Sequence, residues 1–106
     1  MIKHLSNANE FENEVKEGLV LVDFYADWCG PCQMFGPIFE EVSEKMPDVH
    51  FVKFEIDDVN RRTPAKFGIR SIPSVLAFKN GEIKEARTGL MDHETLIQWI
   101  DELKKA

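Results

Sequence analysis

The chain has 106 residues, which is the length of one domain and too short for two independent hydrophobic cores. Hydrophobic residues make up 43% and charged residues 30%, close to the globular average, so intrinsic disorder and fibrous repeats are excluded. Thirteen Lys and Arg against nineteen Asp and Glu give a net charge of −6. The basic residues are also scattered, which argues against a nucleic-acid partner.

The sequence lacks the apolar segments of a membrane or secreted protein. The longest nearly apolar stretch, 18–26, is interrupted by Asp23 and is far shorter than the ~20 residues of a membrane span. The first residues lack the apolar core, roughly 7–15 residues long, of a secretory signal. We therefore expect a cytosolic, monomeric protein with one domain, 1–106, and no contact with membranes, although a leader removed earlier would leave no trace.

The first quarter of the chain predicts two strands separated by a helix. A short edge strand is expected at 2–5. Asn7 has the spacing to cap a helix, which should end before Gly18. Residues 19–26 are β-branched, aromatic and almost uninterrupted, which is typical of a central strand covered on both faces. Asp23 is the anomaly in this strand.

A long helix, a strand and a short helix are expected next. Apolar residues recur at helical spacing from the turn at 28–31 to Pro47. Pro37, inside this helix, should remove one hydrogen bond and bend the axis. Residues 50–56 alternate between two faces, as in a strand. A short helix is expected at about 59–67.

The last third of the chain predicts a hairpin and a helix. Residues 75–78 and 82–88 flank Asn80-Gly81, a pair that suits a type I′ turn because both positions tolerate positive φ. Asp92 should cap a final helix, whose buried stripe is formed by Leu96, Ile97, Ile100 and Leu103. The alternation of short strands and helices indicates an α/β sandwich.

Both cysteines lie in one motif, Trp28-Cys29-Gly30-Pro31-Cys32, between the buried strand and the long helix. A helix N-terminus has unpaired N–H groups and a positive dipole end, so it stabilises an anion such as a thiolate. Residues i and i+3 share a helix face, with Cβ atoms about 5–6 Å apart. We therefore predict a reversible dithiol pair, in which Cys29 is exposed and attacks while Cys32 is shielded and resolves the mixed disulfide.

Three other interpretations of the cysteine pair are open at this point. A purely structural disulfide that closes four residues would contribute only about 2 kcal/mol. A zinc site would need ligands from another copy of the chain, because His4, His50 and His93 are single and widely separated. The two cysteines could also be inert thiols of the core.

Asp23 is unusual because a carboxylate inside an apolar strand is costly unless it is neutral or hydrogen-bonded. Burial should therefore raise the pKa of Asp23. A raised pKa suits proton exchange with Cys32, directly or through water. The alternative is a structural aspartate that is held by hydrogen bonds.

Residues 22–32 read Val-Asp-Phe-Tyr-Ala-Asp-Trp-Cys-Gly-Pro-Cys, and two further segments, 67–74 and 78–81, follow at a fixed separation. The first stretch resembles the active-site signature of the thioredoxin family, and the later segments resemble its second signature. The resemblance covers nearly the whole chain. It implies a thioredoxin fold of the α/β class, with a central mixed sheet of about five strands flanked by about four helices.

The resemblance also implies roles for individual residues. Cys29 would be the nucleophile, Cys32 the resolving thiol and Asp23 the buried carboxylate behind them that transfers a proton. Lys53 matches the family's lysine near that carboxylate, which would pull Asp23 back toward ionisation. Without the resemblance, Lys53 would be a solvated strand residue.

Pro73 matches the family's cis-proline, which packs against the disulfide. A proline here leaves the backbone of Ile72 beside the cysteines, where an extended substrate segment can pair as an added strand. The resemblance then implies a flat apolar substrate-contact surface around Cys29, formed by Trp28, Gly30, Pro31, Ile72, Pro73 and Gly89. Gly89 could instead serve only as a turn before the last helix.

Two positions depart from the family's pattern. Gln33 stands where many members carry a lysine after the second cysteine, so a nearby positive charge is absent and thiolate stabilisation should be weaker. Tyr25 stands where tryptophan is common, and because the two rings are similar in size we expect the surrounding packing to accommodate the tyrosine.

The resemblance implies a general protein-disulfide reductase, which acts on disulfide-containing target proteins by dithiol–disulfide exchange and is re-reduced by a thioredoxin reductase. No organic cofactor or metal is expected. The nearest alternative is a thiol oxidase or disulfide isomerase on the same fold, although Gly30-Pro31 resembles the reductase branch. The other alternative is a redox-independent binding subunit that docks through the surface around Trp28.

Overall fold

The computed structural model describes residues 2–57 and 62–106. Within these ranges the strands form one mixed sheet with the order β1-β3-β2-β4-β5. β1, β3 and β2 are parallel, whereas β4 runs antiparallel to β2, and β5 antiparallel to β4. The strands are β1 (Ile2–Leu5), β2 (Leu19–Tyr25), β3 (His50–Glu55), β4 (Ser74–Lys79) and β5 (Glu82–Thr88), and the helices are α1 (Ala8–Val15), α2 (Gly30–Lys45), α3 (Arg62–Lys66) and α4 (His93–Lys105).

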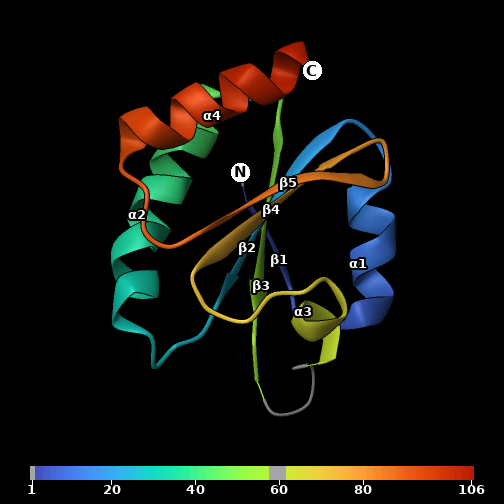
Figure 1. Ribbon diagram of the computed structural model, residues 1–106, viewed down its shortest axis with the longest axis vertical. Coiled ribbons are helices and arrows are strands. Elements are labelled where there is room, and N and C mark those ends of the chain that lie inside the picture. The colour runs from blue at the N-terminus through green and yellow to red at the C-terminus, as the bar shows by residue number, and fades with distance from the viewer. Residues whose placement is uncertain (1, 58–61) are drawn as a thin grey trace.

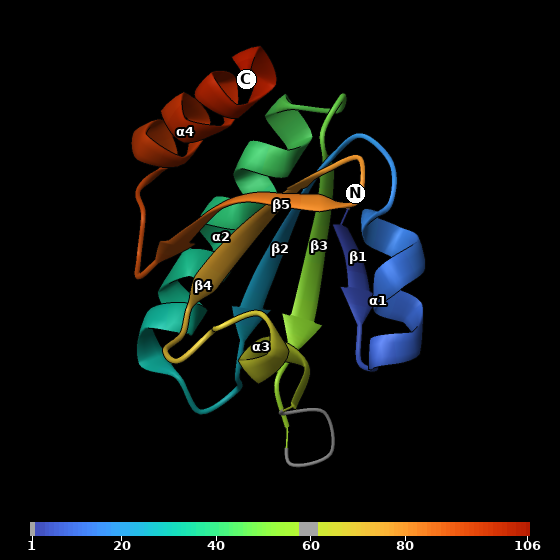
Figure 2. The same cartoon turned by 45° about the vertical axis from the view of Figure 1, so that its right-hand side comes forward.

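Helices cover both faces of the sheet, which gives three layers (Figure 1). α2 and α4 lie on one face, where Phe35 of α2 and Trp99 of α4 share a buried core with Leu21 of β2. α1 and α3 lie on the other face, where Phe11 of α1 packs against Phe24 of β2. The turned view shows the hairpin of β4 and β5, which forms one end of the sheet (Figure 2). The predicted α/β sandwich and the burial of β2 on both faces are therefore confirmed.

The capping and turn signals correspond to local hydrogen bonds. The side chain of Asn7 accepts a bond from Glu10 N at 3.0 Å, and that of Asp92 accepts one from Thr95 N at 2.8 Å. Asn80 has a φ of 51° and Gly81 a φ of 87°, so both central positions of the hairpin have the predicted positive φ. In α4, Leu96, Ile100 and Leu103 are buried as predicted, and Ile97 is partly buried against the same core. Trp99 is also buried, although the predicted stripe did not include it.

Several boundaries differ from the predicted ones. β2 ends at Tyr25 because the carbonyl of Ala26 accepts a turn bond from Cys29 N at 3.2 Å instead of a ladder bond. β3 ends one residue earlier than predicted, and β4 extends one residue further at each end. The short helix α3 begins within the predicted range, of which 59–61 lie outside the described residues. α2 is long and contains Pro37, and the bend at this proline stays a prediction.

None of the helices in residues 2–57 and 62–106 has both the length and the apolar character needed to cross a membrane.

Candidate active site

The two cysteines lie where β2 ends and α2 begins. Cys29 is the N-cap residue of α2, with an extended backbone at φ −95° and ψ 112°, and Pro31 follows in the first turn. Proline suits this turn because its missing N–H would have no helical partner there. Cys29 and Cys32 are joined by a disulfide, with Cα atoms 5.2 Å apart. The predicted pairing of the two sulfurs is therefore confirmed.

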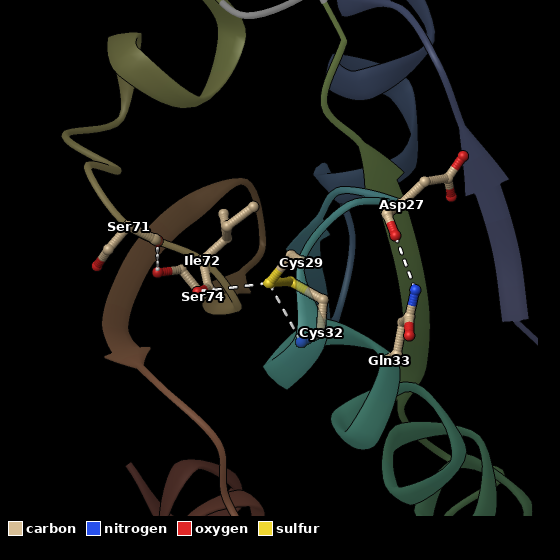
Figure 3. Close-up of a disulfide and its surroundings, with 7 residues drawn as sticks. All are labelled: Asp27, Cys29, Cys32, Gln33, Ser71, Ile72 and Ser74. Carbon is tan, nitrogen blue, oxygen red and sulfur yellow. Dashed lines mark hydrogen bonds between the residues drawn. A yellow bond between two sulfur atoms is a disulfide. The ribbon is translucent and has the colours of Figure 1, made fainter.

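Figure 3 shows the contacts of the Cys29 sulfur. Its Sγ accepts a hydrogen bond from the backbone N–H of Cys32 at 3.2 Å and lies 3.8 Å from the carbonyl oxygen of Ile72. Cys29 is only 6% exposed and Cys32 4%, so the prediction that Cys29 is exposed is wrong for this oxidised state. The N-cap conformation turns the sulfur inward, between the first turn of α2 and the Ile72 loop.

The loop that faces the disulfide is fixed by backbone bonds. The Ile72–Pro73 peptide bond is cis, as the resemblance implies. Gly89 N donates to the carbonyl of Pro73 at 2.8 Å, and the hydroxyl of Ser74 donates to the carbonyl of Ser71 at 2.6 Å. Gly89 has a φ of 99°, which favours glycine. Gly89 therefore makes a turn and also anchors the proline beside the cysteines.

The surface around the disulfide has an apolar character. Trp28 is 79% exposed, and Gly30 and Pro31 are also exposed. A pocket of about 210 Å³ beside Trp28 is lined by Ile56, Pro64, Ile69, Arg70, Ser71 and Ile72. Of the residues predicted to contact substrate, Trp28 and Ile72 line this pocket, and Ile56 and Arg70 line it beside them. Ile56 had no sequence signal, and Arg70 lies in the segment 67–74 but was given no role there.

Asp23 is buried in β2, on the face covered by α2. The residue is 1% exposed, and its Oδ1 has no hydrogen-bond partner among the described residues. Burial raises the pKa of Asp23 from 3.8 to about 7, and the charge of Lys53 opposes this rise. The orphaned oxygen does not support a structural aspartate held by hydrogen bonds. At neutral pH the group has access to both protonation states.

Lys53 lies next to Asp23, as the resemblance implies, because the two residues are register partners in β3 and β2. Its ammonium nitrogen is 4.7 Å from the centroid of the Tyr25 ring. A pocket of about 260 Å³ brings Lys53 together with Cys32, Gln33 and Gly36. The lysine is therefore not simply a solvated strand residue, since it lines a pocket that reaches the inner cysteine.

The two departures from the family pattern have visible contacts. Gln33 donates a hydrogen bond from its side chain to the carbonyl of Asp27 at 2.8 Å (Figure 3). The ring of Tyr25 lies against the Lys53 ammonium group, so Tyr25 does more than fill space. Gly36 gave no sequence signal, because it meets Lys53 of β3 only in the folded chain, where a Cβ on Gly36 would lie 3.3 Å from the Lys53 nitrogen.

His50 and His93 contact surface carboxylates on separate elements rather than sharing a site. His50 pairs with Glu14 at 2.8 Å, and His93 pairs with Glu41. Among residues 2–57 and 62–106, no three His, Cys, Asp or Glu side chains are grouped so that they could hold a metal ion.

Comparison with known proteins places this geometry in a family. The family model described as Thioredoxin matches residues 2–102. The chain belongs to the thioredoxin family. A thioredoxin of Rickettsia prowazekii is 44% identical over 104 residues, which cover 95% of this chain and 97% of that protein. A thioredoxin of Listeria monocytogenes is 43% identical over 102 residues, with coverage of 95% and 97%.

Solved thioredoxin structures share the fold. A mutant thioredoxin from Halobacterium salinarum matches with a TM-score of 0.88 and 33% identity, over 95% of this chain and 88% of that one. The predicted thioredoxin fold is therefore confirmed. Membership of the family and the Cys29–Cys32 pair identify the protein as a disulfide oxidoreductase that acts by dithiol–disulfide exchange.

Proposed function

We propose that the protein reduces disulfides of other proteins, with Cys29 as the attacking thiolate and Cys32 as the resolving thiol, and that a thioredoxin reductase restores the dithiol. The observation that supports these roles most directly is the position of Cys29 as the N-cap of α2. Cys32 lies inside the first turn of α2, three residues further along the chain.

The first step is the attack of Cys29 on a target disulfide. The reduced sulfur is an anion at the positive end of α2, a placement worth about 0.3–1 kcal/mol or more when partly buried. Cys32 N–H already points at this sulfur and would stabilise the thiolate. The Cys29 sulfur forms a bond to one target sulfur, and the other target sulfur leaves as a thiolate.

The second step returns the pair to the disulfide seen in the structure. Cys32 loses its proton and attacks the Cys29 sulfur, so that the second target sulfur leaves and the target has gained two electrons. Asp23 suits the role of proton acceptor because its pKa of about 7 makes both of its forms available at neutral pH. Lys53, from the neighbouring strand, tunes this carboxylate.

The substrate would bind as an extended segment beside Ile72. The Ile72 carbonyl lies 3.8 Å from the Cys29 sulfur, so a segment paired with this backbone would bring its own disulfide to Cys29. The exposed ring of Trp28 and the adjacent Pro31 supply apolar contact area. Because the contact is mainly backbone and apolar surface, many protein disulfides would be accepted.

The roles of the two cysteines are tested by trapping. Cys32→Ser should accumulate mixed disulfides with proteins of a cell extract, detectable by mass spectrometry and released by dithiothreitol. Cys29→Ser is the matched control, which should trap far fewer partners. An absence of adducts on Cys32→Ser, or equal trapping by both variants, would contradict the assignment.

The reductase role is distinguished from an oxidase or isomerase by the redox equilibrium with glutathione. Thioredoxins and protein disulfide isomerase differ by about 90 mV, which corresponds to about 4 kcal/mol for two electrons. We expect a potential well below about −200 mV. A higher value would favour the oxidase or isomerase. We also propose that the protein is a monomer and that it works in the cytosol, because a reducing compartment keeps such a dithiol reduced.

A further inference from the structure

The ammonium group of Lys53 is held by an aromatic ring. Tyr25 is half-buried at the end of β2, and the Lys53 nitrogen lies 4.7 Å from its ring centroid. This distance is inside the limit of about 6 Å for attraction between a cation and an aromatic face. The contact joins two residues on adjacent strands, since Lys53 is the register partner of Asp23, two positions before Tyr25.

The ring is itself fixed in place. Tyr25 and Glu55 are register partners in β2 and β3, so Tyr25 is held in the sheet beside Glu55. Tyr25 also packs against the buried cluster formed by Ala26 and the two cysteines. A turn of the ring away from Lys53 would therefore also break its packing against the cysteines.

Gly36 provides the space for the ammonium on the other side. A Cβ built on Gly36 would lie 3.3 Å from the Lys53 nitrogen, and outside its own helix it would meet no other atom within 4 Å. The methyl group of an alanine here would therefore press on the lysine. The ammonium group lies between the Tyr25 ring and the backbone of α2, in the pocket whose lining also includes Cys32.

Other charged groups compete for this ammonium. Asp27 and Glu40 line the same pocket, Glu55 is the register partner of Tyr25, and Asp57 acts electrostatically on Glu55. On the far side of β3, His4 is the register partner of Lys53. Because the lysine side chain is long and flexible, carboxylates at the pocket's rim would draw its charge outward, away from Asp23, if nothing held it.

We propose that Tyr25 and Gly36 are positioning residues, which hold the Lys53 ammonium inside the pocket behind Cys32 so that its charge acts on Asp23. This inference rests on the proposed function, in which Lys53 tunes the proton acceptor. Tyr25 is thus a functional substitute for tryptophan at this position, because its ring holds the cation.

The test measures the titration midpoint of the Asp23 carboxyl carbon by NMR, with and without Lys53. In the parent protein, Lys53→Met should raise the midpoint by about one pH unit, at the low end of the effect of a nearby opposite charge. In a Tyr25→Leu background the same substitution should have roughly half this effect or less. Tyr25→Phe keeps the ring and is the matched control, with the parent's response.

A second cycle uses Gly36→Ala, which disturbs only the lysine. Gly36→Ala should shift the Asp23 midpoint when Lys53 is present and leave it unchanged in the Lys53→Met background. This cycle decides the matter if Tyr25→Leu does not fold. Comparing both backgrounds removes any effect that Tyr25 or Gly36 has on the burial of Asp23, because such an effect is the same with and without the lysine.

The outcomes separate this inference from the function on which it rests. If Lys53→Met shifts the midpoint equally in the parent, Tyr25→Leu and Gly36→Ala proteins, the positioning role is overturned and the tuning role of Lys53 stands. If Lys53→Met leaves the midpoint unchanged in the parent, the tuning role fails and this inference fails with it. The roles of Cys29 and Cys32 are tested independently by the trapping experiment.

Discussion

Asp23→Asn should make the protein more stable at alkaline pH, although it removes a group of the active site. Burial raises the pKa of Asp23 from 3.8 to about 7 in the folded protein. The folded state therefore holds a proton that the unfolded state has lost, and stability falls as the pH rises between these two values. At about 1.4 kcal/mol per pH unit, the fall amounts to about 4 kcal/mol and is complete above pH 7.

The neutral amide removes this pH dependence but has a cost of its own. A buried amide without partners costs about 1–3 kcal/mol at every pH. Relative to the parent, we expect Asp23→Asn to be less stable or equal near pH 4 and more stable by about 1–3 kcal/mol above pH 8. Turnover near neutral pH should fall, because the proton acceptor is lost.

Urea unfolding of the oxidised proteins between pH 4 and 9 measures this difference. Asp101→Asn is the matched control, because it removes an exposed carboxylate from α4, far from the site. Its stability relative to the parent should change little with pH. If the stability difference between Asp23→Asn and the parent stayed constant from pH 4 to 9, or if Asp23→Asn were less stable than the parent at pH 8, the view that burial destabilises the ionised Asp23 carboxylate would be refuted.

Three further substitutions test the surface and the local signals. Trp28→Ala should reduce kcat/KM for insulin reduction by roughly 5–30-fold, whereas Ile83→Ala, a control that removes an exposed apolar side chain from β5, should change it little. Equal losses in the two variants would contradict a docking role for Trp28. Asp92→Ala should destabilise by about 1 kcal/mol in urea unfolding, because the cap on Thr95 N is lost, and an unchanged midpoint would contradict this. Asn80→Ala should lower the free energy of unfolding by about 1–2 kcal/mol, because Asn80 has a φ of 51°, and Asn80→Gly should lower it less. The reverse order would be inconsistent with backbone strain at this turn.

Local features of the fold were predictable because a few adjacent residues determine them. Asn7 and Asp92 cap their helices through bonds to residues three positions ahead, and the Asn80-Gly81 turn needs only its own positive φ. The buried strand β2 was evident from its uninterrupted apolar run. Asp23 stood out within that run, and the physical cost of burying it already predicted the direction of its pKa.

Features that depend on distant residues were not predictable in the same way. The low exposure of Cys29 follows from the Ile72 loop, which lies 43 residues further along the chain. The importance of Gly36 follows from the Lys53 nitrogen on another strand. The contacts of the Trp99 ring with Glu85 and Arg87 needed the fold, because these residues come from β5 and only the folded hairpin brings them to α4.

The central claim is that Cys29 is an activated thiolate at the N-terminus of α2 in the reduced protein. The rate of its alkylation by iodoacetamide in Cys32→Ser, measured from pH 4 to 10, tests this directly. We predict a rate profile whose midpoint lies at least about one pH unit below that of a free cysteine, which is about 8.5. A midpoint at or above the free-cysteine value would contradict the claim.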